Sequence, residues 1–195
     1  MREAENIDAL QTLDVDWMGM IFFKKSARNV EENVDLVVST PRVGVFVNEI
    51  IEVILEKVRH FSLTKLQLHG DESPAFCRTL KEQFSGEIIK VFSVGETFDF
   101  DKVKPYENLV DYYLFDTKGK QRGGNGMAFD WQILQEYKGQ TPFLLSGGIG
   151  EKHIESIKSF HHSKLIGIDI NSKFEISPAL KDIKKLKIFI HGIRS

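Results

Sequence analysis

Short apolar runs alternate with longer amphipathic segments along almost the whole chain, and this alternation constrains the fold most. The apolar runs are Asp16–Phe23, Val43–Asn48, Lys65–Gly70, Ile88–Val94, Tyr112–Asp116, Pro142–Gly148 and Leu165–Ile170. Runs of this length and composition predict buried strands, and the segments between them place apolar residues on one helical face. Strict strand–helix alternation favours a parallel sheet covered by helices, which is either a closed βα barrel or a doubly wound open sheet.

The first element of the chain favours the barrel. Residues Glu3–Leu13 predict a helix with no strand before it, followed by about seven strand–helix units with short linkers. This order is typical of a (β/α)8 TIM barrel that has lost its first strand. We therefore predict one α/β barrel domain over residues 1–195, with the first strand missing from this chain.

Composition excludes several classes of partner. The formal net charge is −2 and the lysines are scattered rather than clustered, so we expect no nucleic-acid partner. The single cysteine, Cys77, rules out an internal disulfide framework and fits a reducing compartment. No apolar run approaches the roughly 18 residues of a membrane span. We expect a cytoplasmic protein that does not contact a membrane.

Polar residues follow most of the predicted strands, at the ends where parallel architectures gather their binding groups. Asp116 is the most informative, because a carboxylate at the end of a buried strand is costly unless it has partners or chemical work. Asp116 could instead cap the next loop or pair with Lys118, and His69 could simply hydrogen-bond the backbone. The candidate site residues at these strand ends are Arg28, His69, Asp116, Gly147, Gly148, Asp169, Asn171 and Ser172.

Two of these strand ends indicate a phosphate site. Gly147 and Gly148 follow a strand and directly precede a predicted helix, so backbone N–H groups can face an anion. One strand–helix unit later, the sequence DINS places Asp169, Asn171 and Ser172 at the next strand end. Barrels commonly bind phosphate after their last two strands, which is where these residues lie.

The chain resembles phosphoribosylanthranilate isomerase over nearly its whole length. The motifs that carry the resemblance are FFKKSAR, RVGVFVN, LQLHGDESPAFCR, IIKVFSV, LFDTKGKQRGGNGMAFDW, LLSGGI and IGIDINSKFE, in this order. The resemblance implies a βα barrel that catalyses an Amadori rearrangement, converting an aminoaldose phosphate into a ketose by acid–base chemistry alone. It implies a small sugar-phosphate substrate, no metal and no organic cofactor.

The resemblance also implies a role for each candidate residue. Asp116 corresponds to the general acid that protonates the ring oxygen of the ribose, and Arg28 to the arginine that holds the anthranilate carboxylate. Gly123, Gly124 and Gly126 belong to a loop that folds over the substrate. The remaining carry-overs are phosphate contacts from Gly147, Gly148, Asn171 and Ser172, a sugar-hydroxyl contact from Asp169, and a substrate contact from His69.

One departure from the family pattern affects catalysis directly. The family carries a Lys-x-Cys-Gly motif on its first strand, and that cysteine is the general base. Here the sequence MREAENIDAL resembles the residues that follow the motif, so a chain that starts at an internal methionine would account for both the missing base and the missing strand. We expect residues 1–195 alone to be nearly inactive, and expect the two unpaired barrel edges to pair two copies into a homodimer or to stay open.

Two other functions stay open at this point. A non-catalytic barrel that has discarded the cysteine could bind a sugar phosphate or a partner protein. Another isomerase or synthase from the phosphate-binding barrels would keep the phosphate site, but not the specific QLHGDESP and FDTKGK runs. Retention of Asp116, Arg28 and the glycines favours the isomerase.

Overall fold

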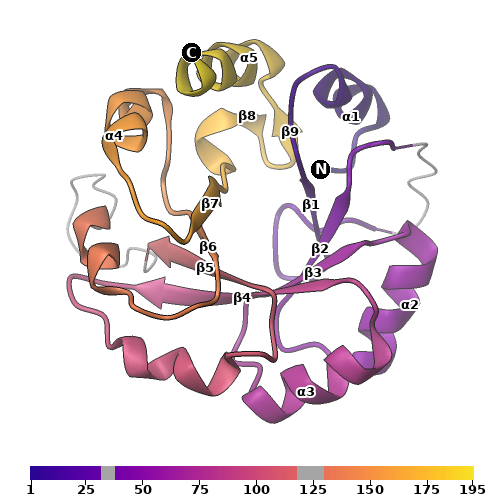
Figure 1. Ribbon diagram of the computed structural model, residues 1–195. Coiled ribbons are helices and arrows are strands. Elements are labelled where there is room, and N and C mark those ends of the chain that lie inside the picture. Colours follow the sequence, from indigo (N-terminus) through magenta and orange to yellow (C-terminus); the bar gives the residue numbers. More distant parts are fainter. Residues whose placement is uncertain (32–37, 118–129) are drawn as a thin grey trace.

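Seven parallel strands form one curled sheet in which neighbours in sequence are neighbours in space, in the order β1 to β7 (Figure 1). The computed structural model describes residues 1–31, 38–117 and 130–195. The strands are β1 (Met18–Ile21), β2 (Arg42–Phe46), β3 (Lys65–Leu68), β4 (Glu87–Val94), β5 (Tyr112–Thr117), β6 (Phe143–Leu145) and β7 (Leu165–Ile168). Each falls inside or next to a run predicted from the sequence, which confirms the parallel α/β barrel architecture.

The helices lie outside the curled sheet (Figure 1). They are α1 (Ala4–Gln11), α2 (Ile51–Phe61), α3 (Pro74–Gln83), α4 (Ile154–Ser159) and α5 (Ile183–Arg194), with short 3-10 turns at Phe100–Lys102, Lys104–Tyr106, Trp131–Glu136, Glu151–His153 and Ser172–Phe174. Helix α3 begins as its sequence predicts, with Ser73 accepting a hydrogen bond from the Phe76 N–H and Pro74 in the first turn. None of the described helices is long and apolar enough to cross a membrane.

Side chains alternate between the two faces of each strand, and this alternation separates two apolar clusters. The outer cluster joins strand residues such as Leu66 and Phe115 to helix residues such as Leu80. The inner cluster fills the barrel with strand residues alone, namely Val43, Ile89, Val91, Leu114 and Leu144. A residue two positions after an inner one therefore also faces the barrel interior, and this rule places Asp116 (after Leu114) at the inner mouth.

The two end strands of the sheet, β1 and β7, are not paired with each other. Between them lie the short antiparallel hairpin of β8 (Glu175–Ser177) and β9 (Leu180–Lys181) and, outside it, helix α5, which packs against both α4 and α1 (Figure 1). Ile166 on β7 is 48% exposed. The described sheet therefore stays open between β1 and β7, but the β1 edge is partly paired: Met1 N donates to the Gly19 carbonyl, and the Val30 N–H donates to the Ile21 carbonyl.

Two features differ from the sequence prediction. The hairpin β8–β9 was not predicted, because its strands are too short to show an apolar period. The apolar residues of the lysine-rich last helix predict that Ile183, Leu186, Ile188 and Phe189 face inward, but Ile188 is 63% exposed. The other three pack against the core together with Ile190 and Ile193, because these positions recur every three or four residues on one helix face and Ile188 lies off that face.

Candidate active site

Asp116 and His69 face each other at the carboxyl ends of β5 and β3. Asp116 pairs in register with Ser93 on β4, and His69 comes directly after Leu68, the last residue of β3. His69 Nε2 lies 3.5 Å from Asp116 Oδ2, and the two side chains are 37% and 25% exposed. On its other side, His69 Nδ1 lies 3.2 Å from Gln67 Nε2. Within the part of the chain that the structure describes, the imidazole is therefore held between two side chains and not by the backbone.

A second carboxyl, that of Asp169, lies in the same mouth. Asp169 follows β7, and its Oδ2 accepts a hydrogen bond of 2.9 Å from Ser146 Oγ at the end of β6. Burial raises the pKa of Asp169, and the charge of Asp116 raises it further against the opposing effect of Ser146. Two carboxyls and an imidazole thus converge at one end of the barrel, an arrangement suited to moving protons.

Arg28 has a partner that the sequence did not predict. Its guanidinium binds the carboxylate of Glu175 on β8, with Nε at 3.0 and 2.8 Å from Oε1 and Oε2, and Nη2 at 2.5 Å from Oε2. Glu175 is nearly buried, with 4% of its side chain exposed, whereas Arg28 is 28% exposed. The bonds to Glu175 use Nε and Nη2, so the Nη1 edge takes no part in them. Glu175 fixes the direction of Arg28 without using all its donors.

Lys181 on β9 connects this ion pair to the predicted phosphate end. Lys181 Nζ lies 3.1 Å from Glu175 Oε1 and 2.5 Å from Asn171 Oδ1. Burial lowers the pKa of Lys181, and the negative charge of Glu175 opposes that effect. Sequence reasoning missed both Lys181 and Glu175, because Lys181 is one of many lysines in the C-terminal region and the hairpin that holds them has no periodic signal.

The four predicted phosphate contacts lie at the ends of the neighbouring strands β6 and β7. Gly147 and Gly148 have φ values of 97° and 66°, which side chains rarely tolerate, so this turn requires glycine. Asn171 directs its side chain to Lys181, and Ser172 begins a 3-10 turn. The described residues show no direct contact between this end and Arg28, which is reached through Lys181 and Glu175. The predicted loop glycines, Gly123, Gly124 and Gly126, fall outside the described residues, as does Lys118.

The ion pairs of Glu175 should make the free energy of unfolding fall as the pH is lowered below 4.5. Burial alone would raise the pKa of Glu175, but hydrogen bonds and charge from Arg28 and Lys181 outweigh it, so the pKa lies below its ordinary value of 4.5. A carboxyl with a lowered folded-state pKa stabilises the fold above the unfolded-state pKa, and that contribution is lost as the pH falls through the folded value. Glu175→Gln should cost about 1.5–3 kcal/mol at pH 7.

Urea unfolding of Glu175→Gln and the parent at pH 7 and in steps below pH 4.5 measures this contribution. The difference between them should shrink as the pH falls. Glu3→Gln, at an ion pair whose Glu3 side chain is 59% exposed, is the matched control and should change stability by less than about 1 kcal/mol. A loss for Glu175→Gln that is the same at every pH would contradict the assignment.

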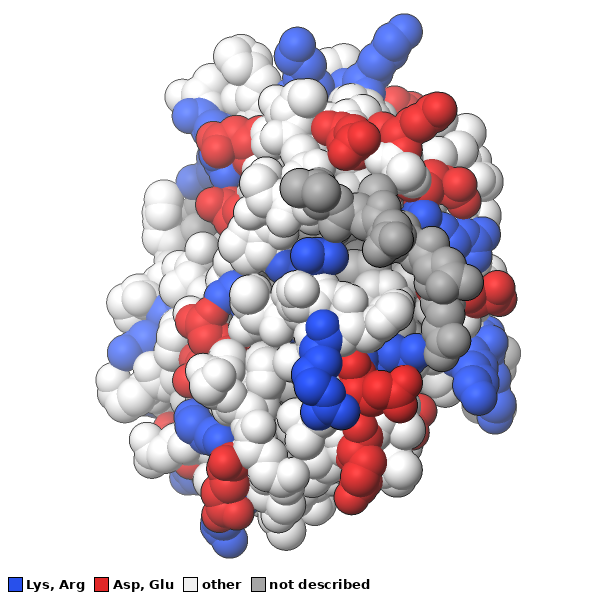
Figure 2. Space-filling view, turned by 90° about the vertical axis from the view of Figure 1, so that its right-hand side faces the viewer, with Lys and Arg blue, Asp and Glu red and all other residues white. Residues whose placement is uncertain are grey.

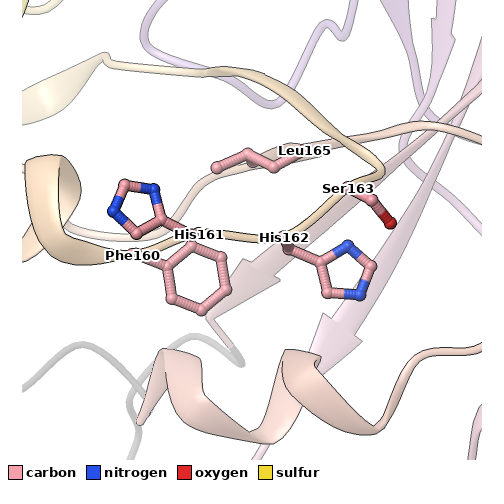
Figure 3. Close-up of a pocket in the computed structure, with 5 residues that line it drawn as sticks. All are labelled: Phe160, His161, His162, Ser163 and Leu165. Atoms are coloured by element: carbon pink, nitrogen blue, oxygen red, sulfur yellow. The ribbon is translucent and has the colours of Figure 1, made fainter.

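Other surfaces of the described residues are less suited to the chemistry. A hollow of about 450 Å³ is lined by Phe160, His161, His162, Ser163 and Leu165, at the amino end of β7 and so at the opposite end of that strand from Asp169 (Figure 3). Its two imidazoles point in different directions, and His162 Nε2 lies 3.2 Å from the Tyr137 carbonyl. No group of metal-ligating side chains is found among the described residues. On the face in Figure 2, Lys and Arg are interspersed with Asp and Glu.

Comparison with known proteins agrees with this architecture. A family model for N-(5'-phosphoribosyl)anthranilate (PRA) isomerase matches residues 1–192. The N-(5'-phosphoribosyl)anthranilate isomerase of Parabacteroides distasonis is 48% identical over 200 residues, covering 99% of this chain and 90% of the relative. That of Phocaeicola vulgatus is 47% identical, covering 100% of this chain and 95% of the relative.

Solved structures give the same result. The phosphoribosyl anthranilate isomerase from Thermus thermophilus matches with a TM-score of 0.81 at 21% identity, covering 100% of this chain and 95% of that one. A phosphoribosyl anthranilate isomerase in complex with reduced 1-(o-carboxyphenylamino)-1-deoxyribulose 5-phosphate matches with a TM-score of 0.75 at 29% identity and the same coverage. The matched family model and the close relatives together show that this chain belongs to the phosphoribosylanthranilate isomerase family.

Proposed function

We propose that the chain is a phosphoribosylanthranilate isomerase of tryptophan biosynthesis, which converts N-(5-phosphoribosyl)anthranilate into the 1-deoxyribulose 5-phosphate ketose. One observation carries the proposal: Asp116 lies at the inner mouth of a barrel of this family, 3.5 Å from His69 and close enough to Asp169 to alter its pKa. A carboxyl in that position can deliver a proton to a bound sugar.

The reaction divides into two proton transfers. Asp116 donates a proton to the ring oxygen, the bond between that oxygen and C1 breaks, and the nitrogen lone pair forms the C=N bond of a Schiff base. A base then removes the C2 proton, the electrons of that C–H bond form a C1=C2 double bond, and the C=N electrons return to nitrogen to give an enol. Protonation at C1 and loss of the proton from the C2 hydroxyl then give the ketose. No electrons leave or enter the substrate, so these steps need only an acid and a base.

The binding contacts follow from the charges of the substrate. Arg28 binds the anthranilate carboxylate through donors that Glu175 leaves available, a task suited to a planar guanidinium. Gly147 and Gly148, with Asn171 and Ser172, bind the phosphate at the ends of β6 and β7. The carboxyl of Asp169 accepts from a sugar hydroxyl, and His69 contacts the substrate beside Asp116. Each of these roles is supported by position at the strand ends and by the family motifs.

The general base is not Cys77. Cys77 is the single cysteine of the sequence, lies fully buried in α3, and therefore faces away from the barrel mouth. Burial raises its pKa to about 11, so it carries almost no thiolate at neutral pH. Residues 1–195 thus supply the acid of the proposed reaction but not the cysteine base that the family resemblance implies.

The proposal extends to assembly and location. The unpaired β7 edge, with Ile166 exposed, offers a surface on which two copies can meet as a homodimer. A structural relative from Thermotoga maritima is described as generated monomers of a dimeric phosphoribosylanthranilate isomerase. Cys77 is a free thiol, which suits the reducing cytoplasm.

A second candidate function is a barrel that binds the sugar phosphate without converting it, since Cys77, the single cysteine of residues 1–195, is buried in α3. An assay that follows the loss of phosphoribosylanthranilate fluorescence distinguishes the two. For this assay, a short strand that ends in Cys-Gly is added before residue 1 to supply a cysteine base. Turnover well above the rate in buffer supports the isomerase, whereas binding without turnover would establish the second function.

A further inference from the structure

A buried ion pair lies behind the barrel wall, outside the proposed chemistry. Lys90 on β4 sits between the inner residues Ile89 and Val91, so its own side chain faces the helices. Its Nζ lies 3.1 Å from Oε2 of Glu72, in the loop between β3 and α3. The exposed fractions of the two side chains are 4% and 1%. None of the steps proposed above uses either group.

The pair holds the backbone on both sides of His69. Lys90 Nζ donates to the carbonyl of Leu68 at 3.2 Å and to that of Gly70 at 2.7 Å, the residues just before and just after His69. The Glu72 carboxylate accepts from the Gly70 N–H at 3.0 and 3.2 Å. Two charged groups therefore bind the main chain of this short segment, which leaves the His69 backbone little freedom.

The same carboxylate joins a second strand end to this segment. Glu72 Oε1 accepts from the Asn48 N–H at 2.8 Å, and Asn48 Oδ1 accepts from the Asp71 N–H at 2.6 Å. A side chain at Gly70 would place its Cβ 2.3 Å from Asn48 Oδ1 and 2.7 Å from the Asn48 backbone nitrogen, so the two loops are in close contact. The loops after β2 and β3 thus form one unit around Glu72.

A buried ion pair is an expensive way to fill this space. Apolar residues of similar volume often give equal or greater stability, so the pair is better explained by the geometry that it imposes. The segment whose backbone Lys90 and Glu72 bind carries the His69 imidazole, which lies 3.5 Å from Asp116. The ion pair can therefore set the position of a group at the proposed site.

We propose that Lys90 and Glu72 are positioning residues for the proposed isomerase, which fix the His69 imidazole against Asp116 so that both meet the sugar of the substrate. The inference rests on the proposed function. In this proposal Glu72 and Lys90 affect ligand recognition only through His69.

The test is a double-mutant cycle between Lys90 and His69, read by binding of reduced 1-(o-carboxyphenylamino)-1-deoxyribulose 5-phosphate to residues 1–195. Lys90→Met should weaken binding on the order of tenfold in the parent, and should have almost no effect in a His69→Ala background. Lys81→Met is the matched control and should bind as the parent does. Lys81 lies in the last turn of α3 and makes a half-exposed ion pair with Asp111. Circular dichroism confirms that each variant is folded.

Glu72→Gln is the second probe, for use if Lys90→Met does not fold. Its amide oxygen still accepts from the Gly70 and Asn48 N–H groups, so we expect the variant to stay folded. It should weaken binding in the parent and not in His69→Ala. Parental affinity in the folded variants, or an equal loss in both backgrounds, would overturn the inference while leaving the proposed function intact. A parent that does not bind the compound at all would overturn the proposed function and the inference with it.

Discussion

The chain of 195 residues should convert phosphoribosylanthranilate about 10²–10⁴-fold more slowly than the same chain preceded by a short strand that ends in Cys-Gly. In the proposed mechanism Asp116 protonates the ring oxygen in both forms, but only the extended chain supplies a cysteine to accept the C2 proton. One correctly placed acid or base typically contributes this factor. The rates are measured from the loss of substrate fluorescence under identical conditions.

Asp116→Asn in the extended chain is the control for the other half of the reaction. Its amide keeps the shape of the carboxyl but cannot deliver a proton, so the rate should fall by a similar factor while the fold is kept. Equal rates for the shorter and extended chains would contradict the division into acid and base. An inactive extended chain that still binds the substrate would favour the non-catalytic barrel.

Lys90→Met should lower the free energy of unfolding by about 3–5 kcal/mol. Methionine fills most of the space of the lysine stem but leaves the Glu72 carboxylate buried without its counter-charge, and leaves the Leu68 and Gly70 carbonyls without their shared donor. A buried charge that loses its partner retains the full cost of desolvation. Urea unfolding at pH 7 measures the change.

Two variants check this explanation. Lys81→Met removes the half-exposed pair with Asp111 and should cost less than about 1 kcal/mol. Adding Glu72→Gln to Lys90→Met removes the orphaned charge and should restore much of the lost stability. A loss for Lys90→Met no greater than that for Lys81→Met would show that the pair contributes no more than a surface contact.

Hydrophobic period predicted most of the fold because the central strands of the sheet are buried on both faces and read as compact apolar runs. The place of Asp116 at the carboxyl end of one such run could be predicted for the same reason. The hairpin β8–β9 escaped because its strands are only three and two residues long. On α5, Ile188 was wrongly placed inward because it adjoins Phe189, which is buried, although Ile188 itself lies off the buried face of the helix.

The contacts around the site were harder to foresee. Arg28 and Glu175 are 147 positions apart in sequence, and the residues around each one do not predict that the two will pair. Lys90 lies within the apolar run IIKVFSV, where one lysine does not change the prediction of a strand. Its partner Glu72 sits in a polar loop, a place where an acidic residue normally faces water. Pairing between distant segments becomes visible only when the loops are placed in space.

The consecutive order of the strands in the sheet has a consequence for the order of folding. Every neighbouring pair of strands is also consecutive in the chain, so each pairing closes a short loop and the sheet can grow one unit at a time. Side-chain bonds between the two ends of the chain, such as those of Arg28 with Glu175 and of Asn6 with Lys181, instead span 147 and 175 positions. We expect such long-range contacts to form late in folding, so that variants that remove them unfold faster but fold at nearly the same rate.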